Sequence, residues 1–100
     1  MFGDIIQKAK EHGAELVILF GSRAKGKEKE YSDIDICVVA ETTSKRRLAS
    51  VLQAEIEHEL PIDIIVYTPK EWEECIADES SFASKIISEG RVLYGQQKIS

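Results

Sequence analysis

The chain has 100 residues and a formal net charge of −5 at pH 7; 43% of its residues are hydrophobic and 31% are charged. This length predicts a single domain over 1–100, and no apolar run approaches the roughly 20 residues that span a bilayer, so we expect a cytoplasmic protein. The negative charge argues against a broad nucleic-acid-binding surface, although one nucleoside triphosphate needs only a few local cations and a metal ion.

The sequence predicts helices and strands that alternate along most of the chain. Asp4 is the candidate N-cap of the first helix, Thr43 or Ser44 that of the longest, and Thr68 followed by Pro69 is a strong helix start. The expected segments are a helix over 4–12, a strand over 15–20, a short helical turn over 22–25, a charged loop over 26–31, a strand over 33–40, a long helix that ends before 61, a strand over 62–67, a helix from 69, a helix over 81–88, an edge strand over 91–94 and a polar tail over 95–100.

This order predicts an α/β or α+β domain with a small mixed sheet flanked by helices. Strands 33–40 and 62–67 are joined through a helix, which favours a parallel right-handed crossover, whereas the short link after strand 15–20 favours antiparallel pairing. The end of the first strand then lies beside the starts of the other two. Five residues are therefore expected at one edge of the sheet: Gly21, Ser22, Asp33, Asp35 and Asp63.

Two carboxylates open the second strand. Side chains alternate between the faces of a strand, so Asp33 and Asp35 project from one face while Ile34 and Ile36 point to the other. Carboxylates this close repel each other unless a cation lies between them. Oxygen ligands at a strand end suit Mg²⁺, which takes its other ligands from water and phosphates. We therefore predict a magnesium site at Asp33 and Asp35.

The turn after the first strand suits a phosphate group. Gly21 lets the backbone approach a triphosphate without a side chain in the way. Ser22 can donate its hydroxyl to a phosphate oxygen at the start of a helical turn, and Arg23 is the candidate cation beside it. These three residues are the predicted nucleotide-binding set.

Gly-Ser, a spacer of about ten residues and Asp-x-Asp resembles the nucleotidyltransferase superfamily of DNA polymerase β. The short length and the wording from Gly21 to Asp35 are similar to the minimal nucleotidyltransferases, or MNT proteins, and the similarity extends through Tyr94. The resemblance implies a polymerase β-like fold. It also implies a third carboxylate on the next strand, matched here by Asp63, whose place in its strand is comparable to that of Asp33.

The resemblance implies a reaction as well. AMP moves from ATP to a hydroxyl, with Asp33 and Asp35 holding the nucleotide-bound Mg²⁺ and Asp63 sharing a second ion and accepting the proton. MNT proteins of this size resemble antitoxins that adenylylate a tyrosine of a HEPN ribonuclease toxin. A HEPN toxin is therefore the expected partner, in a homo- or hetero-oligomer.

Two other functions stay open. A transferase acting on small molecules resembles the aminoglycoside nucleotidyltransferases, which carry an additional helical domain to hold the drug. A non-catalytic antitoxin would instead neutralise its partner by contact alone. Replacing Asp33 and Asp35 separates these hypotheses, because a pure binder would still neutralise its partner.

The remaining polar and aromatic residues receive structural interpretations. The basic residues Lys45, Arg46 and Arg47 begin the long helix, at the sheet edge away from the predicted metal site, where they are a solvated helix terminus or a partner-docking face. Other residues are expected at the surface or helix ends (His12, His58), as a buried thiol (Cys37), or in the core and helix contacts (Tyr67, Trp72, Phe82, Tyr94).

Overall fold

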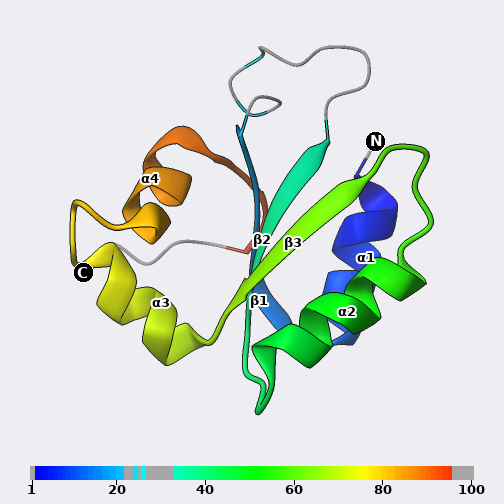
Figure 1. Cartoon of the computed structure of the whole chain (residues 1–100), viewed down its shortest axis with the longest axis horizontal. Coiled ribbons are helices and arrows are strands. Elements are labelled where there is room, and N and C mark those ends of the chain that lie inside the picture. The colour runs from blue at the N-terminus through cyan, green and yellow to red at the C-terminus, as the bar shows by residue number, and fades with distance from the viewer. Residues whose placement is uncertain (1, 22–23, 25, 27–32, 96–100) are drawn as a thin grey trace.

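The computed structural model describes residues 2–21, 24, 26 and 33–95, and shows a sheet with a pair of helices on each face (Figure 1). The elements are α1 (Gly3–Glu11), β1 (Ala14–Phe20), β2 (Ile34–Ala40), α2 (Lys45–Glu55), β3 (Ile62–Tyr67), α3 (Pro69–Ile76), α4 (Phe82–Glu89) and β4 (Arg91–Tyr94). Most of these bounds confirm the expected elements to within one or two residues, but α2 ends at Glu55, several residues before the Pro61 that was expected to close this segment. Most of the expected helical turn over 22–25, most of the charged loop and the tail over 96–100 lie outside the described residues.

The four strands form one mixed sheet in the order β3-β2-β1-β4. The strand β1 runs antiparallel to β2, whereas β2 and β3 are parallel, as the connections predicted. The edge strand β4 pairs with β1 and also runs antiparallel to it. The register sets Phe20 opposite Asp35, and Asp35 in turn opposite Asp63. The last residue of β1 and the first residues of β2 and β3 therefore meet at one edge of the sheet.

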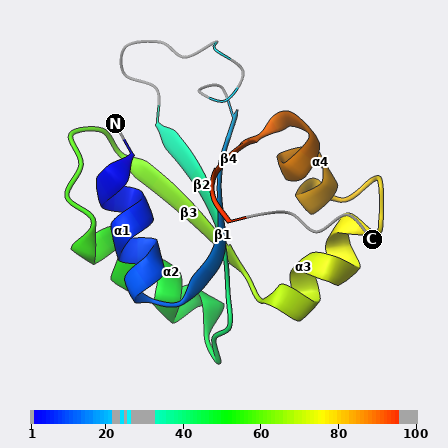
Figure 2. The same ribbon diagram turned by 180° about the vertical axis from the view of Figure 1, so that it is seen from behind.

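Alternation along the strands divides the core into two layers. Ile34, Ile36 and Val38 of β2 contact the layer under α1 and α2, whereas Cys37 and Val39 belong to the layer under α3 and α4. Figures 1 and 2 show these helix pairs on opposite sides of the sheet. In the described part of the chain, no helix is long and apolar enough to cross a membrane.

Three helices begin with a hydroxyl cap. Ser44, Thr68 and Ser81 each accept a hydrogen bond from the backbone N–H three residues later. Such a cap typically contributes about 1 kcal/mol, because it satisfies a donor that the first helical turn leaves unpaired. Local sequence therefore determines where these helices start.

The predicted cap at Asp4 is wrong. Phe2 is the N-cap residue of α1 and no side chain caps that helix. Asp4 lies in the first turn, where one carboxylate oxygen accepts from the backbone N–H of Ile5 and the other lies 3.1 Å from Nδ1 of His58. A partner 54 residues away in sequence, which no local pattern reveals, determines the role of this carboxylate.

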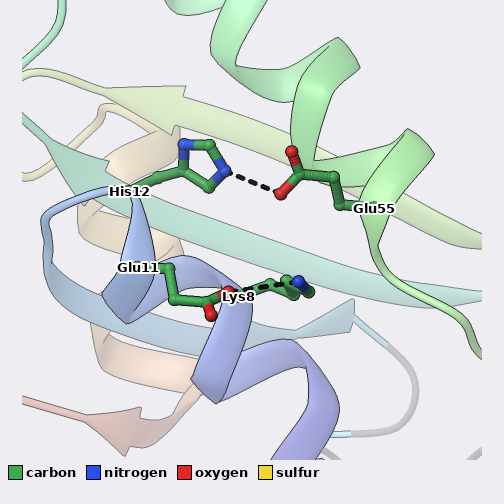
Figure 3. A network of polar contacts seen from close by, with 4 residues as sticks. All are labelled: Lys8, Glu11, His12 and Glu55. Atoms are coloured by element: carbon green, nitrogen blue, oxygen red, sulfur yellow. Dashed lines mark hydrogen bonds and ion pairs between the residues drawn. The ribbon is translucent and has the colours of Figure 1, made fainter.

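Two histidine–carboxylate pairs join α1 to α2 and to the segment after it. Nε2 of His12 lies 2.8 Å from Glu55 Oε1, and Lys8 pairs with Glu11 on the same helix (Figure 3). His58 pairs with Asp4 at the other end of α1 and is largely buried rather than a surface residue. These contacts hold α1 against the end of α2, on the face of the sheet away from α3 and α4.

The aromatic residues divide between core and surface. Trp72 is buried, with 3% of its surface exposed, and its ring meets that of Tyr67 edge to face. Phe82 was expected in the core, but half of its surface is exposed because α4 turns Ala83 and Ile86 toward the sheet instead. The predicted buried thiol is confirmed: Cys37 is fully buried, and this burial raises its pKa to about 12, so the thiol stays protonated.

Candidate active site

Asp35 lies at the centre of the predicted acidic edge. It is the second residue of β2, and its Cα neighbours across the sheet are Phe20 of β1 and Asp63 of β3. Asp63 is thus level with Asp35 and not with Asp33, because Ile34 pairs with Ile62 and Asp33 directly precedes β2. The structure brings Asp35 and Asp63 together on adjacent strands.

These carboxylates lie on the face of the sheet that α3 and α4 cover farther along. Ile34, Ile36 and Ile64 contact the layer on the α1 side, so alternation directs Asp35 and Asp63 to the opposite face. Asp35 is partly buried, whereas Asp33 and Asp63 are exposed. The carboxylates of Asp33 and Asp63 are therefore accessible to solvent, whereas that of Asp35 lies closer to the sheet.

The electrostatic state of Asp35 reflects this crowding. Partial burial raises the pKa of Asp35 above its ordinary value, and the negative charges of Asp63 and then Asp33 raise it further. Each cause disfavours the ionised form of Asp35. A cation bound between the three carboxylates would relieve the repulsion.

Gly21 leaves the space that Asp35 occupies. Its φ is +76°, a conformation that favours glycine, and a Cβ built on it would overlap Oδ2 of Asp35 and lie 3.2 Å from its Cγ. A side chain at this position would displace the carboxylate. The glycine therefore allows the backbone after β1 to approach Asp35 closely.

The donor set suits a hard divalent cation. Carboxylate oxygens are the ligands that Mg²⁺ prefers, with water and phosphate supplying the rest. In the part of the chain that the structure describes, no three acidic, histidine or cysteine side chains form a group that could hold a metal ion. Asp33, Asp35 and Asp63 supply the oxygen donors that Mg²⁺ prefers, but as placed they form no metal site by themselves.

Ser22 and Arg23, the other predicted phosphate-binding residues, lie outside the described residues. Sequence reasoning assigned no role to Arg91, which begins β4 opposite Leu19 and is exposed. This register places a cationic residue at the same edge of the sheet as Phe20. Only the pairing of β4 with β1 could have revealed its position.

The structure also has an open depression of about 560 Å³ along α4. Ser81, Phe82, Ser84, Lys85 and Ser88 are among the residues that line it. No residue of the acidic edge is among its described lining, so we assign the candidate site to the carboxylates and Gly21.

Comparison with known proteins gives a family match over almost the whole chain. The family described as polymerase beta, nucleotidyltransferase, matches residues 4–99. A curated relative from Methanocaldococcus jannaschii, MJ1305, carries the name of a protein adenylyltransferase and is 46% identical over 48 residues. This match covers 45% of the present chain and 33% of the relative, so it spans about a third of that protein's length.

Solved structures share the fold. A toxin–antitoxin structure with AMP-PNP has a TM-score of 0.64 at 24% identity, over 94% of this chain and 73% of that one. A mutant of the toxin–antitoxin MntA-HpeT has a TM-score of 0.65 at 22% identity, over 97% and 75%. A nucleotidyltransferase structure from Sulfolobus solfataricus has a TM-score of 0.62 at 20% identity, over 95% and 78%. The predicted polymerase β-like α+β fold is confirmed.

Proposed function

The chain belongs to the polymerase beta nucleotidyltransferase family, and from this premise we propose that it transfers AMP from ATP to a hydroxyl group of a partner protein in a Mg²⁺-dependent reaction. The expected acceptor is a tyrosine of a HEPN-type toxin, which would make this protein an antitoxin. The name of the relative MJ1305 supports protein adenylylation, and the toxin–antitoxin structures support a toxin as the partner.

One observation carries the proposal. Asp35 lies between Gly21 on one side and Asp63 on the other, and its pKa is raised by burial and by the neighbouring carboxylates. A surface that only binds another protein does not require carboxylates held this close, and their mutual repulsion disfavours the ionised forms. A metal–nucleotide site needs this arrangement, because phosphoryl-type transfer depends on positioning and charge neutralisation.

The three acidic side chains divide between two proposed roles. Asp33 and Asp35 would hold Mg²⁺, which neutralises charge on the phosphates and orients them. Gly21 and Ser22 approach the triphosphate through backbone and hydroxyl, with Arg23 as a further candidate contact. Asp63, exposed beside Asp35, accepts the proton of the attacking hydroxyl.

The chemistry then balances as a simple displacement. The acceptor oxygen forms a bond to the α-phosphorus of ATP while the bond from that phosphorus to the bridging oxygen of the β-phosphate breaks. Pyrophosphate leaves with the electron pair of the broken bond. The acceptor's proton moves to an Asp63 carboxylate oxygen. The products are an AMP ester of the acceptor and pyrophosphate.

The experiment is an intact-mass measurement on the candidate partner, the product of the neighbouring gene, incubated with this protein, ATP and Mg²⁺. We expect the partner to gain one or more AMP units, and the gain to disappear with Asp33→Ala/Asp35→Ala. The variant should be checked for an unchanged fold by circular dichroism. Peptide mapping then identifies the modified residue, which we expect to be a tyrosine.

Other outcomes would point to the alternatives. A stable complex with no mass gain, and toxin still neutralised by the double variant, would establish an antitoxin that acts by binding. AMP transfer to small hydroxylated molecules but not to the partner would instead establish a small-molecule transferase. Either result would overturn protein adenylylation.

A further inference from the structure

Phe82 is an exposed aromatic residue on the active-site face of the sheet. Half of its surface is exposed, and Val92, at 43%, is the other large hydrophobic residue in the described ranges with comparable exposure. The described rings of Phe20, Tyr67, Trp72 and Tyr94 are buried or partly buried. Packing of the core does not explain why the phenylalanine at the first residue of α4 is exposed.

The ring of Phe82 is held beside the acidic edge. It meets the ring of Phe20 edge to face, with centroids 5.8 Å apart and planes at 86°. Phe20 is the last residue of β1 and the direct strand neighbour of Asp35. Side chains of paired residues project from the same face at a Cβ separation of about 4.5–5.5 Å, so Phe20 links Phe82 to the carboxylate.

The two phenylalanines and the carboxylates share one face. Phe20 contacts the core layer formed with α3 and α4, as do Cys37 and Val39, which follow Asp35 along β2. Alternation places Asp35 on that face as well. If the phosphates of a nucleotide lie at Asp35, an aromatic surface is therefore available to the nucleotide on the same face of the sheet, on the side toward α4.

We propose that Phe82, positioned by Phe20, is the stacking surface for the base of the nucleoside triphosphate. This inference rests on the proposed nucleotidyltransferase function and adds the recognition of the base. Aromatic rings stack on any nucleobase because every base has a π-face, so the contact favours bound nucleotide without selecting one base by hydrogen bonds. Purine nucleotides, whose bases have the larger ring system, should gain the most binding affinity from this stacking.

The test distinguishes the contribution of the base to binding from that of the phosphates. Isothermal titration calorimetry compares binding of AMP-PNP and of inorganic tripolyphosphate, each with Mg²⁺, to the wild type and to Phe82→Ala. We expect Phe82→Ala to weaken AMP-PNP binding by on the order of 5- to 100-fold. Binding of tripolyphosphate should be unchanged. Phe82→Tyr, which keeps the ring, should bind AMP-PNP as the wild type does.

Val92→Ala is the matched control, because it removes an equally exposed apolar side chain from β4. It should leave both ligands unaffected, and thermal unfolding should show that every variant is folded. Equal AMP-PNP affinity of wild type and Phe82→Ala would overturn the stacking role while leaving the proposed function intact. A wild type that binds neither AMP-PNP nor tripolyphosphate would overturn the proposed function, and the stacking role with it.

Discussion

The backbone at Gly21 lies directly against the carboxylate of Asp35, although Gly21 follows the end of β1 and Asp35 belongs to β2. An ideal Cβ on Gly21 would lie 3.2 Å from Cγ of Asp35 and overlap its Oδ2. This close approach joins the two halves of the Gly-Ser and Asp-x-Asp pattern in space. It makes the glycine a requirement of the site rather than of the turn alone.

Gly21→Ala should therefore abolish nucleotide binding through displacement of Asp35. The matched control is Gly13→Ala, since Gly13 also has a positive φ, +82°, but a Cβ there meets nothing within 4 Å. Both substitutions should lower the free energy of unfolding by about 1–2 kcal/mol from backbone strain. Calorimetric titration with Mg²⁺ and AMP-PNP should show a loss only for Gly21→Ala; equal affinities would contradict the role of the close approach.

Asp35→Asn should stabilise the protein while abolishing AMP transfer. Because the pKa of Asp35 is raised in the folded state, its ionised form opposes folding at neutral pH, and this cost falls as the pH drops through that raised pKa. With Asp35 partly exposed, we expect a gain of a few tenths to about 1 kcal/mol, or a rise in Tm of at most about 8 °C.

Thermal unfolding without metal measures this gain. Asp78→Asn is the control, and it should lower the Tm instead of raising it. Hydrogen bonds from Ser80 lower the pKa of Asp78, so its ionised form supports folding. Added Mg²⁺ should raise the Tm of the wild type more than that of Asp35→Asn. An Asp35→Asn variant less stable than the wild type would contradict the repulsion.

The Asp4–His58 contact should give the protein an acid-sensitive increment of stability. Burial alone would raise the pKa of Asp4, but the hydrogen bonds from His58 and from the Ile5 N–H outweigh it and lower the pKa below 3.8. The contribution of this contact to the free energy of unfolding is therefore complete above pH 3.8, and it is lost as the pH falls through the lowered pKa of Asp4.

Urea unfolding of the wild type and Asp4→Asn should differ by about 0.5 kcal/mol at pH 6, a value reduced by the partial exposure of the carboxylate. The difference should close as the pH falls from 6 through the lowered pKa of Asp4. Glu59→Gln, at an exposed acidic residue, is the control. A difference between wild type and Asp4→Asn that stays constant over this pH range would show that ionisation of Asp4 does not contribute.

Reversing the charges at the start of α2 should leave nucleotide binding intact. This helix follows the end of β2, where Ala40 pairs with Ala14, and so begins at the opposite end of the sheet from Asp35. Lys45 pairs with Glu71 at 2.6 Å, so Arg46→Glu/Arg47→Glu is the cleaner variant. Its affinity for Mg²⁺ and AMP-PNP should match the wild type within about twofold, because exposed charges this far apart are screened.

The same variant tests whether this end of α2 docks a partner. A weakened complex with unchanged nucleotide affinity would assign Arg46 and Arg47 to a partner-docking face. Loss of nucleotide affinity would instead contradict their placement away from the site.

Short-range rules predicted most of the fold. Hydroxyl caps at Ser44 and Thr68 act within a few residues, so the helix starts could be read directly. Alternation along β2 predicted that Asp35 faces away from Ile34 and Ile36. The connections between strands predicted the parallel and antiparallel pairs, and hence the edge at which Gly21 and Asp63 meet Asp35.

The amino-acid sequence by itself determined the elements, the mixed sheet and the acidic edge, because propensity, capping and alternation depend on neighbouring residues. Tertiary structure decided which residues face one another. It set Asp63 level with Asp35, gave Asp4 its distant partner His58, and exposed Phe82 beside Phe20. Register and exposure depend on how complete elements lie against one another, and a slip of one residue in the pairing of a strand turns every side chain of that strand to the other face.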